Sequence, residues 1–371
     1  MQAETRNKKK LLRTERLPSD MKGVTADWLS RILRLEYPDI VVKNMEVVEF
    51  IGGHDTKLRL KLDLNKAGID AGIPEHVCLK SNLEGHAPSL PVGVNEARFY
   101  NFYRESKDVF TIPAPACYFA DWDDDAVGQQ GLMIIDDLIE LGGTFGTSAN
   151  PIGVDEMARS LEGLAAIHGS TWASKELAKQ TWLQTAMAPE TVTDDYWSMI
   201  PDYFDAHNKI PERIALFPQW MADDPSRLRK ASAALRAHES KNKCPRCLIH
   251  GDAHLGNSYL RPDGKRIWFD WQIVRKGLPW RDVTYFIIGS IEIEDRRKAE
   301  RDLLRHYLDH FAAMGGKKFT FDEVWEEYRR MVIWGLVAWQ SNINPGEKTM
   351  PPLERFCMAA KDLETHKLLE F

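Results

Sequence analysis

Four polar side chains with the potential for joint chemistry lie in one short stretch of the sequence. The segment LIHGDAHLGNSYL carries His250, Asp252 and Asn257, and Asp270 follows the run RIWF. Asn257 lies five residues after Asp252, and Asp270 lies eighteen residues after Asp252. Phosphoryl transfer to a hydroxyl needs a carboxylate that accepts the proton, and an amide oxygen and second carboxylate that hold Mg²⁺. Asp252 fits the first role, and Asn257 and Asp270 fit the second.

The order and spacing of these residues match two motifs of protein kinases. The motif H-R-D-x-x-x-x-N corresponds to the segment from His250 to Asn257, with glycine in place of arginine, and D-F-G corresponds to the letters DWQ from Asp270. On the segments HGDAHLGN and FDWQ, the chain resembles the aminoglycoside phosphotransferase and choline kinase group, the small-molecule branch of the protein-kinase-like fold. Within this group it is most similar to the set that includes ecdysteroid-kinase-like proteins.

The resemblance extends over nearly the whole chain and implies a two-lobed α+β fold. Alternating and apolar strand patterns dominate up to Leu138, and long helical patterns follow. We therefore expect a basic arm at 1–20, a β-rich nucleotide-binding lobe at 21–138, and a mainly helical lobe at 139–371. The last lobe would carry the catalytic loop and the acceptor site.

Lys80 and Glu96 are expected to form a pair in the N-terminal lobe. Glu96 shares one face of an expected helix at 95–105 with aromatic residues of FYNFY, and a carboxylate on such a face needs a partner. The expected short strand HVCLKS carries Lys80, whose place after VCL is comparable to that of the lysine in V-A-I-K of kinases. The resemblance implies that Lys80 contacts the ATP phosphates and that Glu96 holds it. The alternative is a surface lysine and a solvated glutamate.

Two further segments are candidates for nucleotide contacts. Gly52 and Gly53 lie between two expected strands and could present backbone N–H groups to phosphates, although the segment departs from G-x-G-x-x-G. A plain hairpin turn is the alternative. The strand that ends at Asp136 resembles the hinge whose backbone meets adenine. Its alternative is an exposed acidic turn.

The resemblance also separates the roles of residues around the catalytic loop. It implies that His250, grouped here with Asp252 in the catalytic set, braces the loop while Asp252 acts on the proton. Asp282, in the segment PWRDVTYF, resembles the aspartate that ties the backbone of this loop in the group.

A zinc site competes with this interpretation. Cys244, Cys247, His250 and His254 form C-x2-C-x2-H-x3-H, which has the residue types of a zinc site. The intervening loops are very short for four tetrahedral ligands, and binding would remove His250 from the catalytic loop. We therefore favour the kinase interpretation.

Composition limits the other function classes. The chain has 371 residues, with 49 Lys and Arg against 55 Asp and Glu, a net charge of −6 that disfavours nucleic acid as a partner. Five cysteines in so long a chain fit a reducing cytoplasm, and no apolar stretch reaches the length of a membrane span. The basic residues near the N-terminus fit a solvated arm.

We therefore expect a phosphotransferase that uses ATP and Mg²⁺ and a small hydroxylated acceptor. A catalytically silent nucleotide-binding pseudokinase is the alternative. A protein kinase ranks lower, because only a short segment separates Asp270 from Asp282 and leaves little room for an activation loop. The segment 180–225 contains both carboxylates and aromatic residues, and it does not decide between a cationic and an apolar acceptor.

Overall fold

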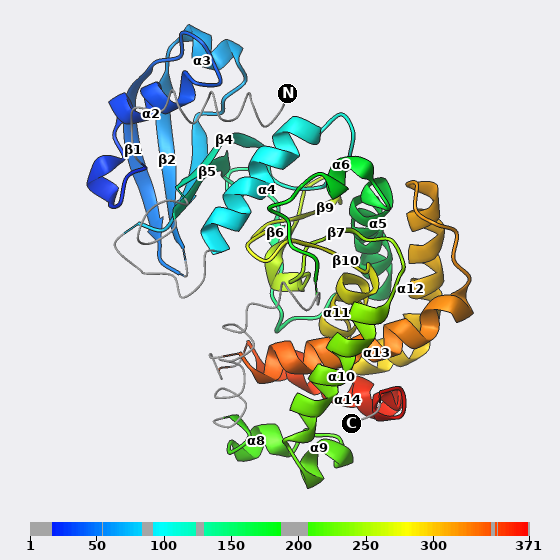
Figure 1. Cartoon of the computed structure of the whole chain (residues 1–371). Coiled ribbons are helices and arrows are strands. Elements are labelled where there is room, and N and C mark those ends of the chain that lie inside the picture. Colours follow the sequence, from blue (N-terminus) through cyan, green and yellow to red (C-terminus); the bar gives the residue numbers. More distant parts are fainter. Residues whose placement is uncertain are drawn as a thin grey trace. The chain divides into compact units, whose positions relative to one another are not determined.

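The computed structural model describes residues 17–53, 55–83, 92–123, 130–186, 207–342, 346 and 348–369. The chain divides into two compact units, each described by itself below (Figure 1). The first holds Met1–Glu105 and Pro115–Glu140, and the second holds Ser106–Ala114 and Leu141–Phe371. The predicted α+β class, with a β-rich N-terminal part and a helical C-terminal part, is confirmed.

The first unit is built on a five-stranded antiparallel sheet in the order β1-β2-β3-β5-β4. Its strands are β1 (Val42–Ile51), β2 (Thr56–Leu64), β3 (His76–Ser81), β4 (Cys117–Asp123) and β5 (Gln130–Asp136). Its helices are α2 (Ala26–Leu33), α3 (Lys66–Asp70) and α4 (Val92–Ser106), after the short 3-10 turn η1 (Met21–Gly23).

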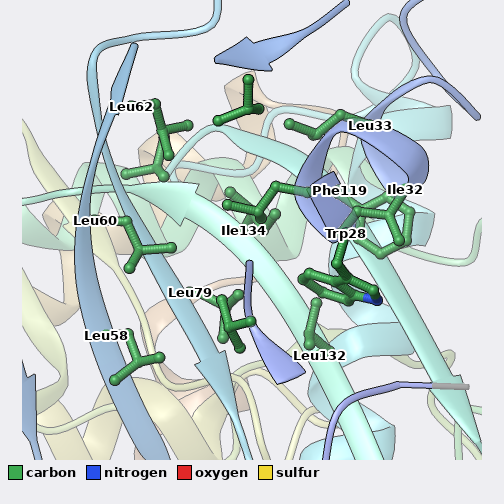
Figure 2. Packing of buried hydrophobic residues seen from close by; sticks show 14 of the residues in the cluster. Trp28, Ile32, Leu33, Leu58, Leu60, Leu62, Leu79, Phe119, Leu132 and Ile134 are labelled. Atoms are coloured by element: carbon green, nitrogen blue, oxygen red, sulfur yellow. The ribbon is translucent and has the colours of Figure 1, made fainter. Parts of the chain in front are cut away.

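Helix α2 covers one face of this sheet and closes its core. The leucines of β2 alternate with polar residues, so that Leu58, Leu60 and Leu62 all point to the same side and are buried. Figure 2 shows them in one cluster with Trp28 of α2 and with side chains of the neighbouring strands. The Thr25 hydroxyl accepts a hydrogen bond from the Trp28 backbone at 3.1 Å, which caps the helix that delivers this indole.

The second unit is mainly helical, with two small sheets. Its helices are α5 (Val154–Thr171), α6 (Lys175–Ala178), α8 (Pro211–Ile214), α9 (Gln219–Asp223), α10 (Arg227–Lys241), α11 (Trp280–Ser290), α12 (Ile293–Ala313), α13 (Phe321–Gln340) and α14 (Met350–Asp362), with 3-10 turns η2 (Leu255–Asn257) and η3 (Thr365–Lys367). Its sheets join β6 (Thr144–Phe145), β8 (Ser258–Leu260) and β9 (Arg266–Trp268), and β7 (Cys247–Ile249) with β10 (Arg275–Gly277).

Two helices of this unit differ from the sequence expectation. Every residue of α11 is buried, so this helix has no solvent-exposed polar face. Its sequence therefore lacks the alternation of polar and apolar residues from which a surface helix can be predicted. The sequence pattern at 353–369 predicts one continuous helix, but α14 ends at Asp362, and Glu364 adopts a left-handed backbone with φ 49° before η3. A left-handed residue stops the hydrogen-bond ladder of a right-handed helix.

Among the described residues, none of the helices has the length and apolar character required to cross a lipid bilayer.

Candidate active site

The structure brings Asp252 and Asn257 together in the loop that follows β7. The Asn257 amide nitrogen donates to the Asp252 carboxylate at 3.0 Å and to the Asp252 carbonyl at 3.1 Å. Asn257 ends the turn η2, whose tight curve carries its side chain back toward Asp252. Because the amide nitrogen faces Asp252, the amide oxygen of Asn257 is directed away from that carboxylate. The spacing of five residues thus allows the Asn257 side chain to bind both the carboxylate and the carbonyl group of Asp252.

Asp282, at the start of α11, fixes the backbone of the same loop. Its carboxylate accepts hydrogen bonds from the backbone N–H groups of His250 at 2.6 Å and Gly251 at 3.0 Å. Gly251 has φ 87°, and a Cβ atom there would lie 2.5 Å from the Ile273 carbonyl oxygen. Only glycine fits this conformation and this approach. The predicted contact between Asp282 and the loop is present. The close approach of Ile273 explains why glycine stands where the protein-kinase motif has arginine.

The His250 ring links the loop to the residue before Asp270. Its Nε2 atom lies 2.9 Å from the Phe269 carbonyl oxygen, and its Nδ1 atom accepts the Asp252 N–H at 3.3 Å. Burial lowers the pKa of His250, in spite of the nearby charge of Asp282, so the ring is neutral near pH 7. A neutral ring has one N–H, which donates to Phe269. His250 therefore holds the loop and is not placed as the proton acceptor.

Asp270 follows β9 in an uncommon backbone conformation. Its φ of 65° lies in the left-handed region, which aspartate tolerates better than most residues. The preceding Phe269 N–H donates to the Asn257 carbonyl at 3.0 Å, so the backbone just before Asp270 lies against the end of the loop that carries Asp252 and Asn257. The charge of Asp270 is the smallest of the influences on the pKa of Asp252, and it opposes the net lowering of that pKa.

His254 also belongs to this site. From the sequence, it was predicted only as a ligand of the alternative zinc site. Its Nδ1 atom accepts the Gly256 N–H at 3.0 Å and lies 2.9 Å from the Ser148 hydroxyl. The proton of a neutral ring is therefore on Nε2, which faces the Asp252 carboxylate at 3.5 Å. Desolvation raises the pKa of Asp252, but His254 and His250 outweigh it and hold that pKa below its usual value.

A buried chain of polar groups supports Asp282 from behind. His168 of α5 lies with Nε2 3.2 Å from the Asp282 carboxylate and Nδ1 2.8 Å from the Tyr307 hydroxyl of α12. All three side chains are buried. His168 and Tyr307 were not predicted, because each lies in an ordinary helical pattern and only packing brings them to Asp282.

In the first unit, the expected pair of Lys80 and Glu96 is present. The Lys80 ammonium of β3 lies 2.6 Å from the Glu96 carboxylate of α4, and the side chains are only 4% and 1% exposed. The alternative of a surface lysine and a solvated glutamate is therefore wrong. Burial of two charges costs solvation free energy, which the attraction between the partners must offset. Buried ion pairs of this kind are therefore typical of functional sites.

The other two predicted nucleotide segments also lie in the first unit. Gly52 and Gly53 are exposed in the turn between β1 and β2. The Asp136 carboxylate accepts the Ala116 N–H at 2.8 Å and the Tyr118 hydroxyl at 2.6 Å, and it thereby joins β5 to β4. The side chain of Asp136 is thus engaged within the unit, so any contact with adenine would fall to backbone groups of this segment.

Arg59 of β2 holds the segment that follows Asp136. Its guanidinium donates to Asp137 at 2.8 Å and to Glu140 at 2.8 Å. Asp137 is buried, so the expectation of a merely exposed acidic turn is wrong. Nothing in the sequence indicates these contacts, because Arg59 occupies an ordinary polar position in the alternating strand.

The Cys and His residues of the competing zinc motif do not form a site. Cys247 is buried with its thiol directed at the Gly277 carbonyl, and His250 is engaged with Phe269. Within the described part of the chain, the donor atoms of these four residues are not gathered as metal ligands would be.

Comparison with known proteins shows the family to which the sequence belongs. A profile of the ecdysteroid kinase-like family matches residues 97–317. The chain belongs to the ecdysteroid kinase-like family. This match includes Asp252, Asn257, Asp270 and Asp282, and it confirms the resemblance drawn from the sequence. None of the curated proteins matches this sequence.

Solved structures show the fold that this ecdysteroid kinase-like chain shares. A choline kinase from Cryptosporidium parvum Iowa II superposes with a TM-score of 0.53 at 10% identity, over 92% of this chain and 97% of that chain. A spectinomycin phosphotransferase in complex with ADP and spectinomycin gives 0.51 at 13% identity, over 92% and 99%. A microcompartment-associated aminopropanol kinase gives 0.51 at 11% identity, over 91% and 96%. These are kinase-like folds at low identity.

Proposed function

We propose that this ecdysteroid kinase-like protein transfers the γ-phosphoryl group of ATP to a hydroxyl group of a small molecule, with Mg²⁺. The observation that carries the proposal is the hydrogen-bonded pair of Asp252 and Asn257, fixed by Asp282 and adjoining the backbone before Asp270. A proton acceptor and oxygen donors for a cation are what phosphoryl transfer requires.

Asp252 would accept the proton of the acceptor hydroxyl. Its side chain is 35% exposed, so an acceptor can reach it, and its lowered pKa keeps the carboxylate ionised near pH 7. The donation from Asn257 and the ring of His254 orient this carboxylate. His250 holds the loop in the required shape and does not itself meet the acceptor.

The oxygen donors of Asn257 and Asp270 fit Mg²⁺, which prefers carboxylate and amide oxygens over nitrogen or sulfur. When bound there, Mg²⁺ would neutralise charge on the ATP phosphates and favour departure of the leaving group. The loop bonds of Asn257 hold its amide with the nitrogen toward Asp252, which orients the oxygen for this purpose.

In the first unit, Lys80 would contact the phosphates and Glu96 would position it. The exposed Gly52 and Gly53 would add backbone N–H groups, and the backbone of the segment from Asp136 would meet adenine.

The proposal of a small acceptor is supported by the solved structures named above, which are a choline kinase, a spectinomycin phosphotransferase and an aminopropanol kinase. Residues 187–206 of the segment 180–225, which left the acceptor class undecided, lie outside the described residues.

Nucleotide binding is tested by the melting temperature of the full chain with and without Mg²⁺-ATP. A ligand that binds only the native state raises the melting temperature. We expect a rise that requires Mg²⁺ and is lost in Asp270→Ala. The exposed Asp302, whose side chain is 83% exposed, gives the control variant Asp302→Ala, which should keep the rise.

Turnover is then tested by release of ADP with a panel of small alcohols. Phosphorylation of an alcohol but not of a peptide library supports the proposal. A Mg²⁺-dependent thermal shift without transfer to any acceptor would favour the pseudokinase. Absence of a shift at saturating nucleotide contradicts the use of ATP.

A further inference from the structure

Three metal-ligating side chains meet on the surface of the second unit, on elements outside the catalytic loop. His306 and His310 lie one turn apart on α12, in the sequence HYLDH, and Glu162 lies on α5. The two helices pack side by side (Figure 1). One ligand atom from each residue can be chosen so that all lie within 4.8 Å of one another. No role in the proposed phosphotransfer uses these residues.

The hydrogen bond of His310 fixes which ring nitrogen is available. Its Nδ1 atom lies 3.0 Å from the His306 carbonyl oxygen, so Nδ1 carries the proton and donates it. The lone pair of neutral His310 is therefore on Nε2, which faces a Glu162 carboxylate oxygen at 3.8 Å. Histidine ligands of metals usually donate their other N–H to a carbonyl or carboxylate in this manner.

The second histidine presents a nitrogen to the same oxygen. The Nε2 atom of His306 lies 3.3 Å from that Glu162 oxygen, is buried, and has no hydrogen-bond partner among the described residues. The two imidazole rings lie with centroids 4.3 Å apart. Two ring nitrogens thus converge on one carboxylate oxygen without a hydrogen bond between them. A cation bound among the three atoms would satisfy the carboxylate oxygen and both ring nitrogens.

We propose that Glu162, His306 and His310 bind a divalent transition-metal ion, with Zn²⁺ the best match. Imidazole nitrogen and carboxylate oxygen are ordinary zinc ligands, at bond lengths of about 2.0–2.1 Å. Such bonds place tetrahedral ligands about 3.3 Å apart. The separations of 3.3 and 3.8 Å from Glu162 to the two rings are close to this value. Water would complete the coordination, since the Glu162 side chain is 44% exposed.

The bound ion would join α5 to α12 beside an existing link between these helices. Tyr307, the neighbour of His306, contacts His168 of α5 at 2.8 Å, and His168 in turn contacts Asp282. A metal at Glu162 would therefore reinforce the helix pair that supports the catalytic loop. Metal binding at this position does not depend on whether the loop transfers phosphate.

Titration of the full chain with ZnCl₂ tests the proposal, after chelator treatment and with Mg²⁺ in excess to occupy oxygen-rich sites. Isothermal calorimetry on the wild type should show one zinc ion per chain. His306→Gln, His310→Gln and Glu162→Gln should each weaken this binding by about tenfold or more, because each removes a ligand atom. Zinc should also raise the melting temperature of the wild type and not of the double variant His306→Gln/His310→Gln.

A matched control is available in His238, which pairs with Glu327 at 2.9 Å but has no second histidine in that contact. His238→Gln should bind zinc as the wild type does, and so should Cys244→Ser, which removes a thiol that is only half-buried. Equal zinc affinity in the wild type and the double variant would overturn the proposal, as would absence of zinc binding by the wild type. The latter result would assign the cluster to plain histidine–carboxylate contacts without a metal.

Discussion

The Asp282 carboxylate lies 2.6 Å from the backbone nitrogen of His250, and it accepts the next backbone N–H, that of Gly251, at 3.0 Å. One side chain from α11 thus sets the course of the loop that carries Asp252. His168 and Tyr307 extend this contact through the interior to α12. The shape of this loop therefore depends on a buried hydrogen-bond acceptor and not only on its own local turn preference.

Asp282→Ala should destabilise the protein and inactivate it. The change leaves two buried N–H groups without an acceptor, and each costs about 1–3 kcal/mol. We expect the free energy of unfolding to fall by about 3 kcal/mol or more, measured by urea denaturation. Asp282→Asn, which keeps one acceptor oxygen, should lose less. A loss within about 0.5 kcal/mol, as expected for the exposed Asp302→Ala, would contradict this role.

Asp252→Asn should remove phosphotransfer while leaving the fold intact. Asparagine keeps the size of the side chain but cannot accept the hydroxyl proton as a carboxylate does. General-base catalysis contributes about 10²–10⁴-fold, so kcat should fall by that factor. Steady-state kinetics measure the change, and the melting temperature of the apo chain provides the control. Full activity of the variant with an accepted substrate would exclude Asp252 as the base.

His254→Ala should shift the pH dependence of the reaction. His254 helps to hold the pKa of Asp252 below its usual value, so its removal raises that pKa. The carboxylate must be ionised to accept a proton, and the acid limb of the kcat/KM profile should therefore move to higher pH. A purely structural effect would lower the rate equally at all pH values. His254→Gln, which can still donate a hydrogen bond, should shift the limb less.

A double-mutant cycle should expose the coupling of Lys80 and Glu96. Each single change, Lys80→Met or Glu96→Gln, removes one charge of the buried pair and should cost about 3–5 kcal/mol. The double variant should regain a large part of that stability, because both charges of the pair are then removed. It should not regain activity if Lys80 contacts the phosphates. Additive losses of stability in the cycle would show that the 2.6 Å contact carries no coupling energy.

Gly251→Ala should impair the loop although it adds only one methyl group. The residue has φ 87°, and its new Cβ atom would meet the Ile273 carbonyl oxygen at 2.5 Å. Strain of this kind costs about 1–3 kcal/mol, and relief of the clash would move the neighbouring Asp252. Gly264→Ala offers a control, since Gly264 also has a positive φ but has no atom within 4 Å of the Cβ position. Equal effects of the two substitutions would show that the close approach is unimportant.

The sequence alone determined the features that depend on short spacing or on a regular period. The alternating leucines of β2 predicted its buried face, and the apolar surroundings of Glu96 required the partner found in Lys80. The five-residue spacing of Asp252 and Asn257 is spanned by one loop and one 3-10 turn, so their contact is nearly a local property. These elements are confirmed because local geometry leaves few other arrangements.

Tertiary structure decided the partners that lie far apart in the chain. Nothing near His168 indicates that it meets Asp282 and Tyr307, and nothing in HYLDH indicates that Glu162 completes its pair of rings. Helix α11 was not predicted for a related reason. A helix that is buried on all sides has no polar face, so its sequence shows no amphipathic period. Contacts of this kind follow from how helices pack, and packing depends on the whole chain rather than on any window of it.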